Sequence, residues 1–262
     1  MFDDLVPLYA LVGPFLLVLF RLLGLLAFVP FFSTSSIPAN IKVLLGLAIT
    51  FCVWNVVPSV RASGPTMPGT LTGLVVAIAG EMTIGLCIGM MLGAVFAGIQ
   101  LGSHMISQQM GLSLATLYDP AFEDQSTVIE QIAFWIAMVA FLSLGGHREI
   151  INAVVYSYRT VPIGSGGLAP EMMLNTVLGA MHAAFYAATQ IAMPALGAFF
   201  IATLTGGLMS RSMPQLNLMS VGITLNLLVG MAMVMAGMTG WAMVSEASLA
   251  ETLRVITRVV GG

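Results

Sequence analysis

The chain has 262 residues, of which 58% are hydrophobic and only 7% are charged. Soluble domains carry roughly 25% charged residues, so this composition excludes a water-exposed surface and predicts an integral membrane protein. The net charge of −3 comes without any cluster of lysine or arginine. That absence argues against binding of nucleic acid or of anionic lipid as a main activity.

Long apolar runs, separated by short clusters of proline, glycine and serine, predict an all-α polytopic membrane protein of long hydrophobic helices and helical hairpins. The runs are residues 10–32, 43–57, 71–101, 132–144, 172–207 and 216–244, the fourth being marginal for a spanning helix. The third and fifth exceed one simple crossing, so each must tilt, break or extend beyond the bilayer core, and Pro194 is a natural break point in the fifth. No internal repeat or long linker divides the chain, which we therefore treat as one domain, residues 1–262.

Two ionisable residues lie deep inside these runs, Arg21 at the middle of the first and Glu81 about a third of the way into the third. A charge at such depth is costly unless it is paired or hydrated, and it therefore marks a candidate functional site. We expect the two side chains to pair with each other or with partner subunits. One interpretation is a buried ion pair that fixes helix register, and another is a proton relay, which usually needs more titratable groups.

Small residues line one face of the third run. Gly85, Gly89 and Gly93 recur every fourth residue, and Ala97 continues the row. Such a face lets another helix approach closely, so we expect it to pack tightly against a helix of this chain or of another subunit.

The segment at residues 108–130, QQMGLSLATLYDPAFEDQSTVIE, separates two apolar runs with a glycine, an Asp-Pro step and several acids. It cannot be a plain membrane helix, yet it is richer in large apolar side chains than a solvated connector. Irregular backbone at membrane depth is tolerated only when it is buried in protein or lines a water-filled cavity. The segment is therefore either a loop that lines or plugs a pore, or a loop packed on the protein surface.

The C-terminal residues differ from the rest of the chain, and we predict an amphipathic tail over residues 245–262. Ser248 and Glu251 have the spacing of a capping box. The tail is expected to lie at the membrane surface or to dock on a partner. Its apolar face consists of Leu249, Leu253, Ile256 and Val260.

The sequence lacks the residue patterns of an enzyme. Its three histidines are scattered, its two cysteines lack metal-ligand spacing, and it has no glycine-rich phosphate loop and no pair of catalytic carboxylates. We therefore expect no catalysis, no cofactor and no bound metal, and any energy for the function must come from partners or a gradient.

Short motifs follow one another in a fixed order along almost the whole chain. The N-terminal series is Arg21, Pro30, Pro38 and Lys42. The middle series is Glu81, Gly85, Gly89, Gly102, residues 109–113 (QMGLS), Asp119-Pro120, Gly146-His147, Ser157 and Pro162. The most specific element is RSMPQLN at residues 211–217, followed by Gly222. Taken together, these motifs resemble the FliR family of flagellar export-gate proteins, whose virulence counterparts form the SctT group of type III secretion.

The resemblance implies a core subunit of the flagellar type III export gate, located in the bacterial inner membrane at the basal body. Such a subunit would assemble with FliP-like and FliQ-like subunits into a helical, pore-forming complex, beside FlhB-like and FlhA-like components, and unfolded flagellar proteins would be its cargo. Assembled members of this family are thought to stand largely above the bilayer plane. The resemblance also implies an assembly role for the C-terminal motif, represented by Arg211, Pro214, Gln215 and Asn217.

The resemblance further implies that the segment after the glycine-rich helix plugs the closed channel and gates it passively. Its apolar side chains would exclude water and ions until cargo displaces the plug, and Gly111 would give the backbone freedom to move. The plug residues would be Gln109, Met110, Gly111, Leu112, Leu114, Leu117, Tyr118, Asp119, Pro120 and Phe122.

Other interpretations stay open at the level of the sequence. The equivalent subunit of a virulence-type injectisome is the first alternative, and a scaffold that nucleates the assembly is another. A small-solute secondary transporter would show repeated halves with matching broken helices, which we do not find. One departure from the family pattern is Asn226, near a position where the family often carries a basic residue, so a charge contact there is in doubt.

Overall fold

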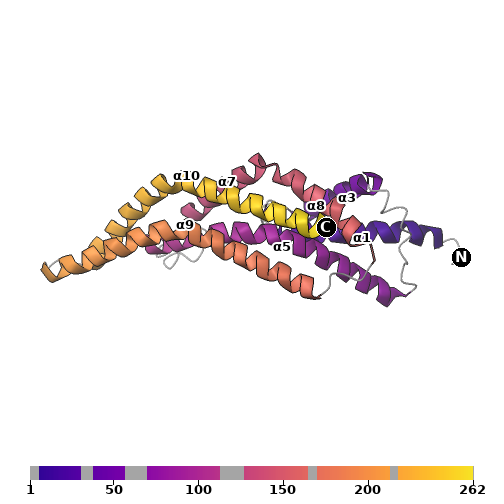
Figure 1. The fold of residues 1–262 in the computed structure, drawn as a ribbon, viewed down its shortest axis with the longest axis horizontal. Coiled ribbons are helices and arrows are strands. Elements are labelled where there is room, and N and C mark those ends of the chain that lie inside the picture. The colour runs from indigo at the N-terminus through magenta and orange to yellow at the C-terminus, as the bar shows by residue number, and fades with distance from the viewer. Residues whose placement is uncertain are drawn as a thin grey trace. The chain divides into compact units, whose positions relative to one another are not determined.

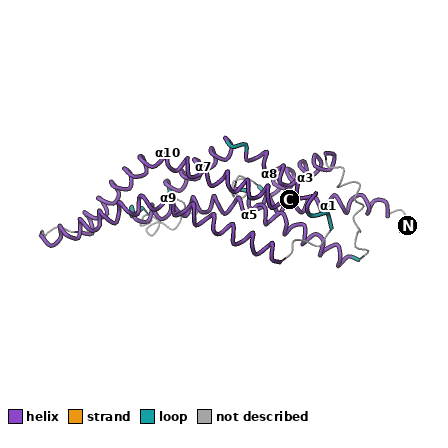
Figure 2. Tube along the Cα trace, viewed as in Figure 1, coloured by secondary structure: helices purple, strands orange, loops and turns teal. Residues whose placement is uncertain are grey.

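The computed structural model describes residues 6–30, 38–56, 70–112, 127–164, 170–212 and 218–261. Within these ranges every regular element is a helix, as Figure 2 shows. The prediction of an all-α fold is therefore confirmed for this part of the chain. In chain order (Figure 1), the helices are α1 (Val6–Phe28), α3 (Ala39–Val56), α5 (Leu71–Gln109), α7 (Val128–Ser143), α8 (Gly146–Thr160), α9 (Pro170–Ser212) and α10 (Leu218–Gly261).

Three of the described helices, α5, α9 and α10, are long and apolar enough to cross a membrane. The bent pair of α7 and α8 makes a fourth candidate if it is counted as one span. The first two apolar runs correspond to shorter apolar helices, Val12–Phe28 within α1 and Ala39–Trp54 within α3. The polytopic membrane character predicted from composition is confirmed, with fewer full-length candidates than the six apolar runs suggested.

The chain packs into two units. Unit 1 comprises Met1–Ala94, Gly145–Met181 and Glu251–Gly262, and unit 2 comprises Val95–Leu144 and His182–Ala250. Thus α1, α3 and α8 belong to unit 1 and α7 to unit 2, whereas α5, α9 and α10 supply residues to both. That the whole chain works as one domain stays a prediction.

In unit 1, α1 packs against α3. The Phe15 ring meets the Trp54 ring edge to face, with centroids 6.0 Å apart. Gly46 of α3 leaves room for the side chains of Leu19 and Leu23 of α1, because a Cβ at this glycine would touch both. The remaining apolar side chains of α3 include an exposed set, Ile41, Val43, Leu44, Leu47 and Phe51.

In unit 2, α5 packs closely against α9 through small residues. A Cβ added at Gly98 would overlap the Ala184 backbone, and one added at Gly102 would lie 2.7 Å from the Ala188 carbonyl oxygen. Such backbone proximity requires glycine on α5, and it is the usual way in which membrane helices gain dense packing. α7 is held to the same stretch of α5 by aromatic contacts of Phe96 with Phe134 and Phe141.

The expectation of a break at Pro194 is wrong. α9 runs from Pro170 to Ser212 with Pro194 in its interior. Proline removes one backbone N–H and crowds the carbonyl four residues earlier. Membrane helices tolerate this loss because neighbouring helices and small local adjustments satisfy the freed backbone groups.

The predicted start of a separate tail helix near Ser248 is also wrong, because α10 is continuous from Leu218 to Gly261. The buried Ser248 hydroxyl makes no hydrogen bond among the described residues, so the capping box with Glu251 does not form. Leu249, Leu253 and Ile256 are each less than 10% exposed. This apolar face is covered by the chain itself and not by a membrane surface, while Val260 lies where side chains are not described.

Candidate functional site

The two charges that the sequence places inside apolar helices meet in unit 1. Arg21 of α1 donates through Nε to Oε2 of Glu81 on α5 at 2.6 Å, although 60 positions separate them. Both side chains are buried, with exposed fractions of 0% and 2%. Of the two pairings left open by the sequence, the structure therefore contains the one within the chain.

Further contacts complete the coordination of this ion pair. The other guanidinium nitrogens of Arg21 donate to the Ser157 hydroxyl at 3.0 Å and to the Val161 carbonyl at 3.1 Å, and the guanidinium lies 4.4 Å from the Tyr158 ring centroid. The second Glu81 oxygen accepts from the Gly164 backbone N–H at 3.0 Å. We call Arg21, Glu81, Ser157 and Tyr158 the buried charge hub.

The geometry of the buried charge hub favours a structural role. Both carboxylate oxygens and all three guanidinium nitrogens are engaged, so a charge pair that would otherwise be costly in an apolar interior is well satisfied. The hub ties α1, α5 and α8 to the turn after α8 in a single arrangement. It thus supports the interpretation in which the pair fixes helix register.

The glycine row on α5 brings the two charges together. A Cβ at Gly85 would overlap the carbonyl group of Arg21, one at Gly89 would lie 2.5 Å from the Leu25 carbonyl oxygen, and one at Gly93 would lie 2.7 Å from the Phe28 carbonyl oxygen. The backbones of α1 and α5 are thus nearly in contact along three turns. This approach places Glu81, one turn before Gly85, beside Arg21.

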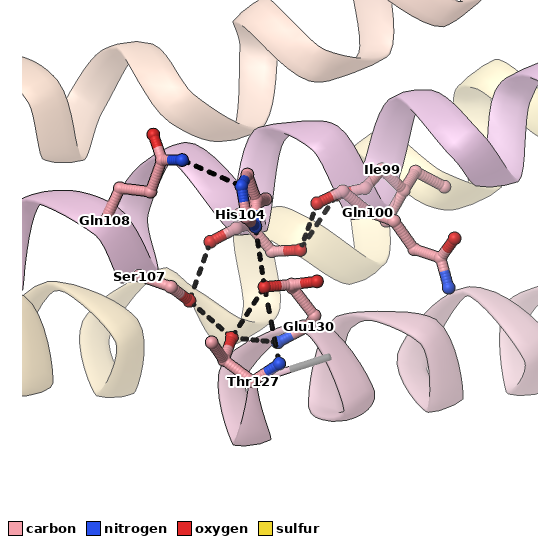
Figure 3. A network of polar contacts seen from close by, with 8 residues as sticks. Ile99, Gln100, His104, Ser107, Gln108, Thr127 and Glu130 are labelled. Carbon is pink, nitrogen blue, oxygen red and sulfur yellow. Dashed lines mark hydrogen bonds and ion pairs between the residues drawn. The ribbon is translucent and has the colours of Figure 1, made fainter. Parts of the chain in front are cut away.

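A second polar cluster lies in unit 2, where α5 ends and α7 begins (Figure 3). His104 Nδ1 lies 2.9 Å from Glu130 Oε1, and Gln108 Nε2 lies 2.9 Å from the other ring nitrogen of His104. One turn along α5, the Ser107 and Thr127 hydroxyl oxygens are 2.7 Å apart. We call His104, Ser107, Gln108, Thr127 and Glu130 the polar clasp.

The polar clasp also starts α7. The Thr127 hydroxyl accepts from the Glu130 backbone N–H, and Glu130 accepts from the Thr127 backbone N–H, which completes a capping box. The Thr127 hydroxyl also donates to Glu130 at 2.8 Å. Sequence reasoning missed these residues, although the T-x-x-E pattern directly before an apolar run is a recognisable helix start.

Of the ten predicted plug residues, four lie within the described part of the chain. Gln109 is the last residue of α5, Met110 is 2% exposed and packs against Gly230 of α10, and Leu112 is half-buried. Gly111 has φ 80°, its N–H donates to the Gln108 carbonyl, and the Leu112 N–H donates to the Ser107 carbonyl. These bonds form a Schellman motif, so Gly111 terminates α5. The other plug residues, Leu114, Leu117, Tyr118, Asp119, Pro120 and Phe122, lie outside the described residues.

Only the first two residues of the C-terminal motif at residues 211–217 lie within the described part of the chain. Arg211 lies in the last turn of α9, where side chains are not described. Pro214, Gln215 and Asn217 lie outside the described residues, between α9 and α10. Their assembly role therefore stays a prediction.

Comparison with known proteins gives the family. The profile of the family "Bacterial export proteins, family 1" matches residues 12–252. The chain is 30% identical to the flagellar biosynthetic protein FliR of Escherichia coli over 92% of this chain and 90% of that protein. It is 26% identical to FliR of Bacillus subtilis, over 94% and 95%, and 27% identical to FliR of Caulobacter vibrioides, over 92% and 94%. The chain therefore belongs to bacterial export protein family 1, as a flagellar export protein of the FliR type with membrane-spanning helices.

Proposed function

We propose that this chain is a core subunit of the flagellar type III export gate in the bacterial inner membrane. With FliP-like and FliQ-like subunits it forms the channel through which unfolded flagellar proteins leave the cell, beside FlhB-like and FlhA-like components at the basal body. The chain performs no catalysis in this account. Its contribution is a wall of the channel and a plug loop that closes it.

The observation that carries this proposal is the exposed apolar surface of α9 and α10. In the most apolar stretch of each helix only 22% and 17% of the residues are buried within the chain, against 61% for α5. The exposed side chains are large and include several soft methionines, which adapt to varied neighbours. Examples are Met193, Phe200, Ile201, Leu204, Leu208, Leu228, Met231, Met235 and Met243.

A bilayer alone is too thin to cover this surface. The apolar parts of α9 and α10, with 40 and 36 residues, are about 60 Å and 54 Å long at the rise of an α-helix. A hydrocarbon core of roughly 30 Å accommodates about 40 Å of a helix even when the helix is strongly tilted. About 20 Å of α9 and about 14 Å of α10 therefore need cover from protein, which supports membership of a multi-subunit assembly.

The plug hypothesis is supported by the two ends of the segment at residues 113–126. The Schellman motif at Gly111 stops α5, and the capping box at Thr127 and Glu130 starts α7. Residues 113–126 therefore lie between two defined helix ends, one at Gly111 and one at Thr127. In our proposal its apolar residues close the channel by excluding water, as hydrophobic constrictions do.

The experiment that tests gating removes bulk from the proposed plug. We expect Leu117→Ala combined with Tyr118→Ala to permit ion leakage across the membrane in cells that express the complete export apparatus, because a wider apolar constriction fills with water. Leu178→Ala, at a side chain 54% exposed on α9, is the matched control and should not leak. Unchanged leakage in the double variant, at normal protein levels, would remove the basis for the plug.

A further inference from the structure

The polar clasp differs in kind from the glycine and aromatic contacts described for unit 2. It joins α5 to α7 through side-chain hydrogen bonds, His104 to Glu130 and Ser107 to Thr127. His104 is 40% exposed, whereas Glu130 is 13% exposed, so water reaches one side of the cluster. The hydrogen bonds of His104 can therefore be exchanged for bonds to water at little net cost, whereas Ser107 is 0% exposed.

Two turns away, the same two helices are held by contacts that water cannot replace. The Phe96 ring of α5 lies 6.0 Å from the Phe134 ring and 6.0 Å from the Phe141 ring of α7, centroid to centroid. Phe96 and Phe141 are 3% and 4% exposed. Separating these rings would expose apolar area, so the aromatic cluster is the fixed part of the α5–α7 contact.

α5 itself cannot move to open the junction, because its backbone is locked to α9. Gly98 and Gly102 approach the Ala184 and Ala188 backbones closely, and Met110 packs against Gly230 of α10. Of the two partners at the clasp, the first turn of α7 is therefore the one that moves in our account. Thr127 caps this turn, Glu130 lies in it, and the turn precedes Phe134 by one to two turns.

We infer that the polar clasp is a latch, which releases the first turn of α7 from the end of α5 while the Phe96, Phe134 and Phe141 cluster acts as the pivot. The release accompanies the passage of cargo, and reformation of the His104–Glu130 and Ser107–Thr127 contacts restores the closed state. This inference rests on the proposed function. It adds a positioning role for residues that the family motifs do not contain.

A reversible cross-link tests the latch directly. The Ser107 and Thr127 hydroxyl oxygens are 2.7 Å apart, so cysteines at both positions should form a disulfide, whose sulfur atoms lie about 2.05 Å apart. The background carries Cys52→Ala, which removes the exposed native thiol, and retains Cys87, which is buried. Ser107→Cys combined with Thr127→Cys replaces the native copy in a flagellated strain, and secretion of flagellar proteins is measured after oxidation with copper phenanthroline and after reduction with dithiothreitol.

We expect oxidation to stop secretion in the double-cysteine strain and reduction to restore it. The two single-cysteine variants and Thr189→Cys, an exposed α9 position in the same unit, control for general oxidation and should secrete throughout. If secretion after complete cross-linking is as fast as it is after reduction with dithiothreitol, the latch is overturned and the proposed function stays intact. Failure of the two thiols to cross-link contradicts the clasp contact and overturns the latch as well. Normal secretion by a strain that lacks this chain altogether would overturn the proposed function, and the latch with it.

A matched pair at Thr127 tests whether its hydroxyl holds the first turn of α7 to α5. Thr127→Val keeps the side-chain shape but loses the hydroxyl that contacts Ser107 and Glu130, whereas Thr127→Ser keeps the hydroxyl. We expect Thr127→Val to raise ion leakage roughly tenfold at unchanged protein level, because it removes both the hydroxyl contact with Ser107 and the cap on α7, and Thr127→Ser to behave like the parent. Equal leakage in the two variants overturns the latch.

Discussion

Removing the Glu81 carboxylate while Arg21 remains is the substitution that should lower the stability of unit 1 most. In Glu81→Met the guanidinium of Arg21, which is 0% exposed, loses its ion-pair partner, and the Gly164 N–H loses its acceptor. Breaking a buried pair from one side costs about 3–5 kcal/mol, because an uncompensated charge is left in an apolar interior. Arg21→Met should lower the stability by a similar amount, because it leaves the Glu81 carboxylate buried without its ion-pair partner.

Replacing both partners should cost less than replacing either one. In Arg21→Met combined with Glu81→Met, no charge remains to be compensated, and apolar side chains fill the space; such exchanges are often close to neutral. The assay is a double-mutant cycle on heat stability of the purified protein in mild detergent, where each single variant should lose on the order of 10 °C. A double variant that loses as much as the two singles combined would refute the hub as a coupled charge pair.

Two further predictions follow from glycine geometry. Gly89→Ala should lower heat stability, because its Cβ would lie 2.5 Å from the Leu25 carbonyl oxygen and force α1 away from α5. The control Gly179→Ala, where nothing lies within 4 Å of the added Cβ, should not lower it. Equal losses in the two variants would contradict the close packing of α1 on α5. Gly111→Ala should lower the free energy of unfolding by about 1–2 kcal/mol, since φ 80° is strained for an L residue. The control Gly206→Ala, with open space around its Cβ, should be neutral in the same assay. A neutral Gly111→Ala would argue against the Schellman motif at the end of α5.

The positions of the long helices follow from the apolar runs, yet their ends do not. The run at residues 71–101 stops where polar residues begin, but α5 continues to Gln109. It continues because the Ser103 and Ser107 hydroxyls donate to backbone carbonyls of their own helix. In addition, His104 and Ser107 form hydrogen bonds with residues at the start of α7. Polarity alone therefore marked the end of the membrane-type segment and not the end of the helix.

Individual site residues were recognisable from the sequence, whereas their partners depended on the fold. Arg21 and Glu81 stand out as charges in apolar runs, and the glycine row signals close packing. That the row brings those two charges together becomes evident only when α1 lies on α5. The His104–Glu130 contact is hidden for the same reason, because it joins residues on either side of residues 113–126. Ser248 and Glu251 show the converse: a capping pattern inside a continuing helix has no free N–H groups to cap.

The central claim is that this chain works as part of a multi-subunit export gate, and co-purification tests it most directly. The protein would be tagged, extracted in mild detergent from cells with a complete flagellar apparatus, and its bound proteins identified by mass spectrometry. We predict recovery of FliP-like and FliQ-like subunits in one stable complex, which would cover the exposed apolar faces of α9 and α10. A stable monomer or homodimer, free of those subunits, would contradict the account.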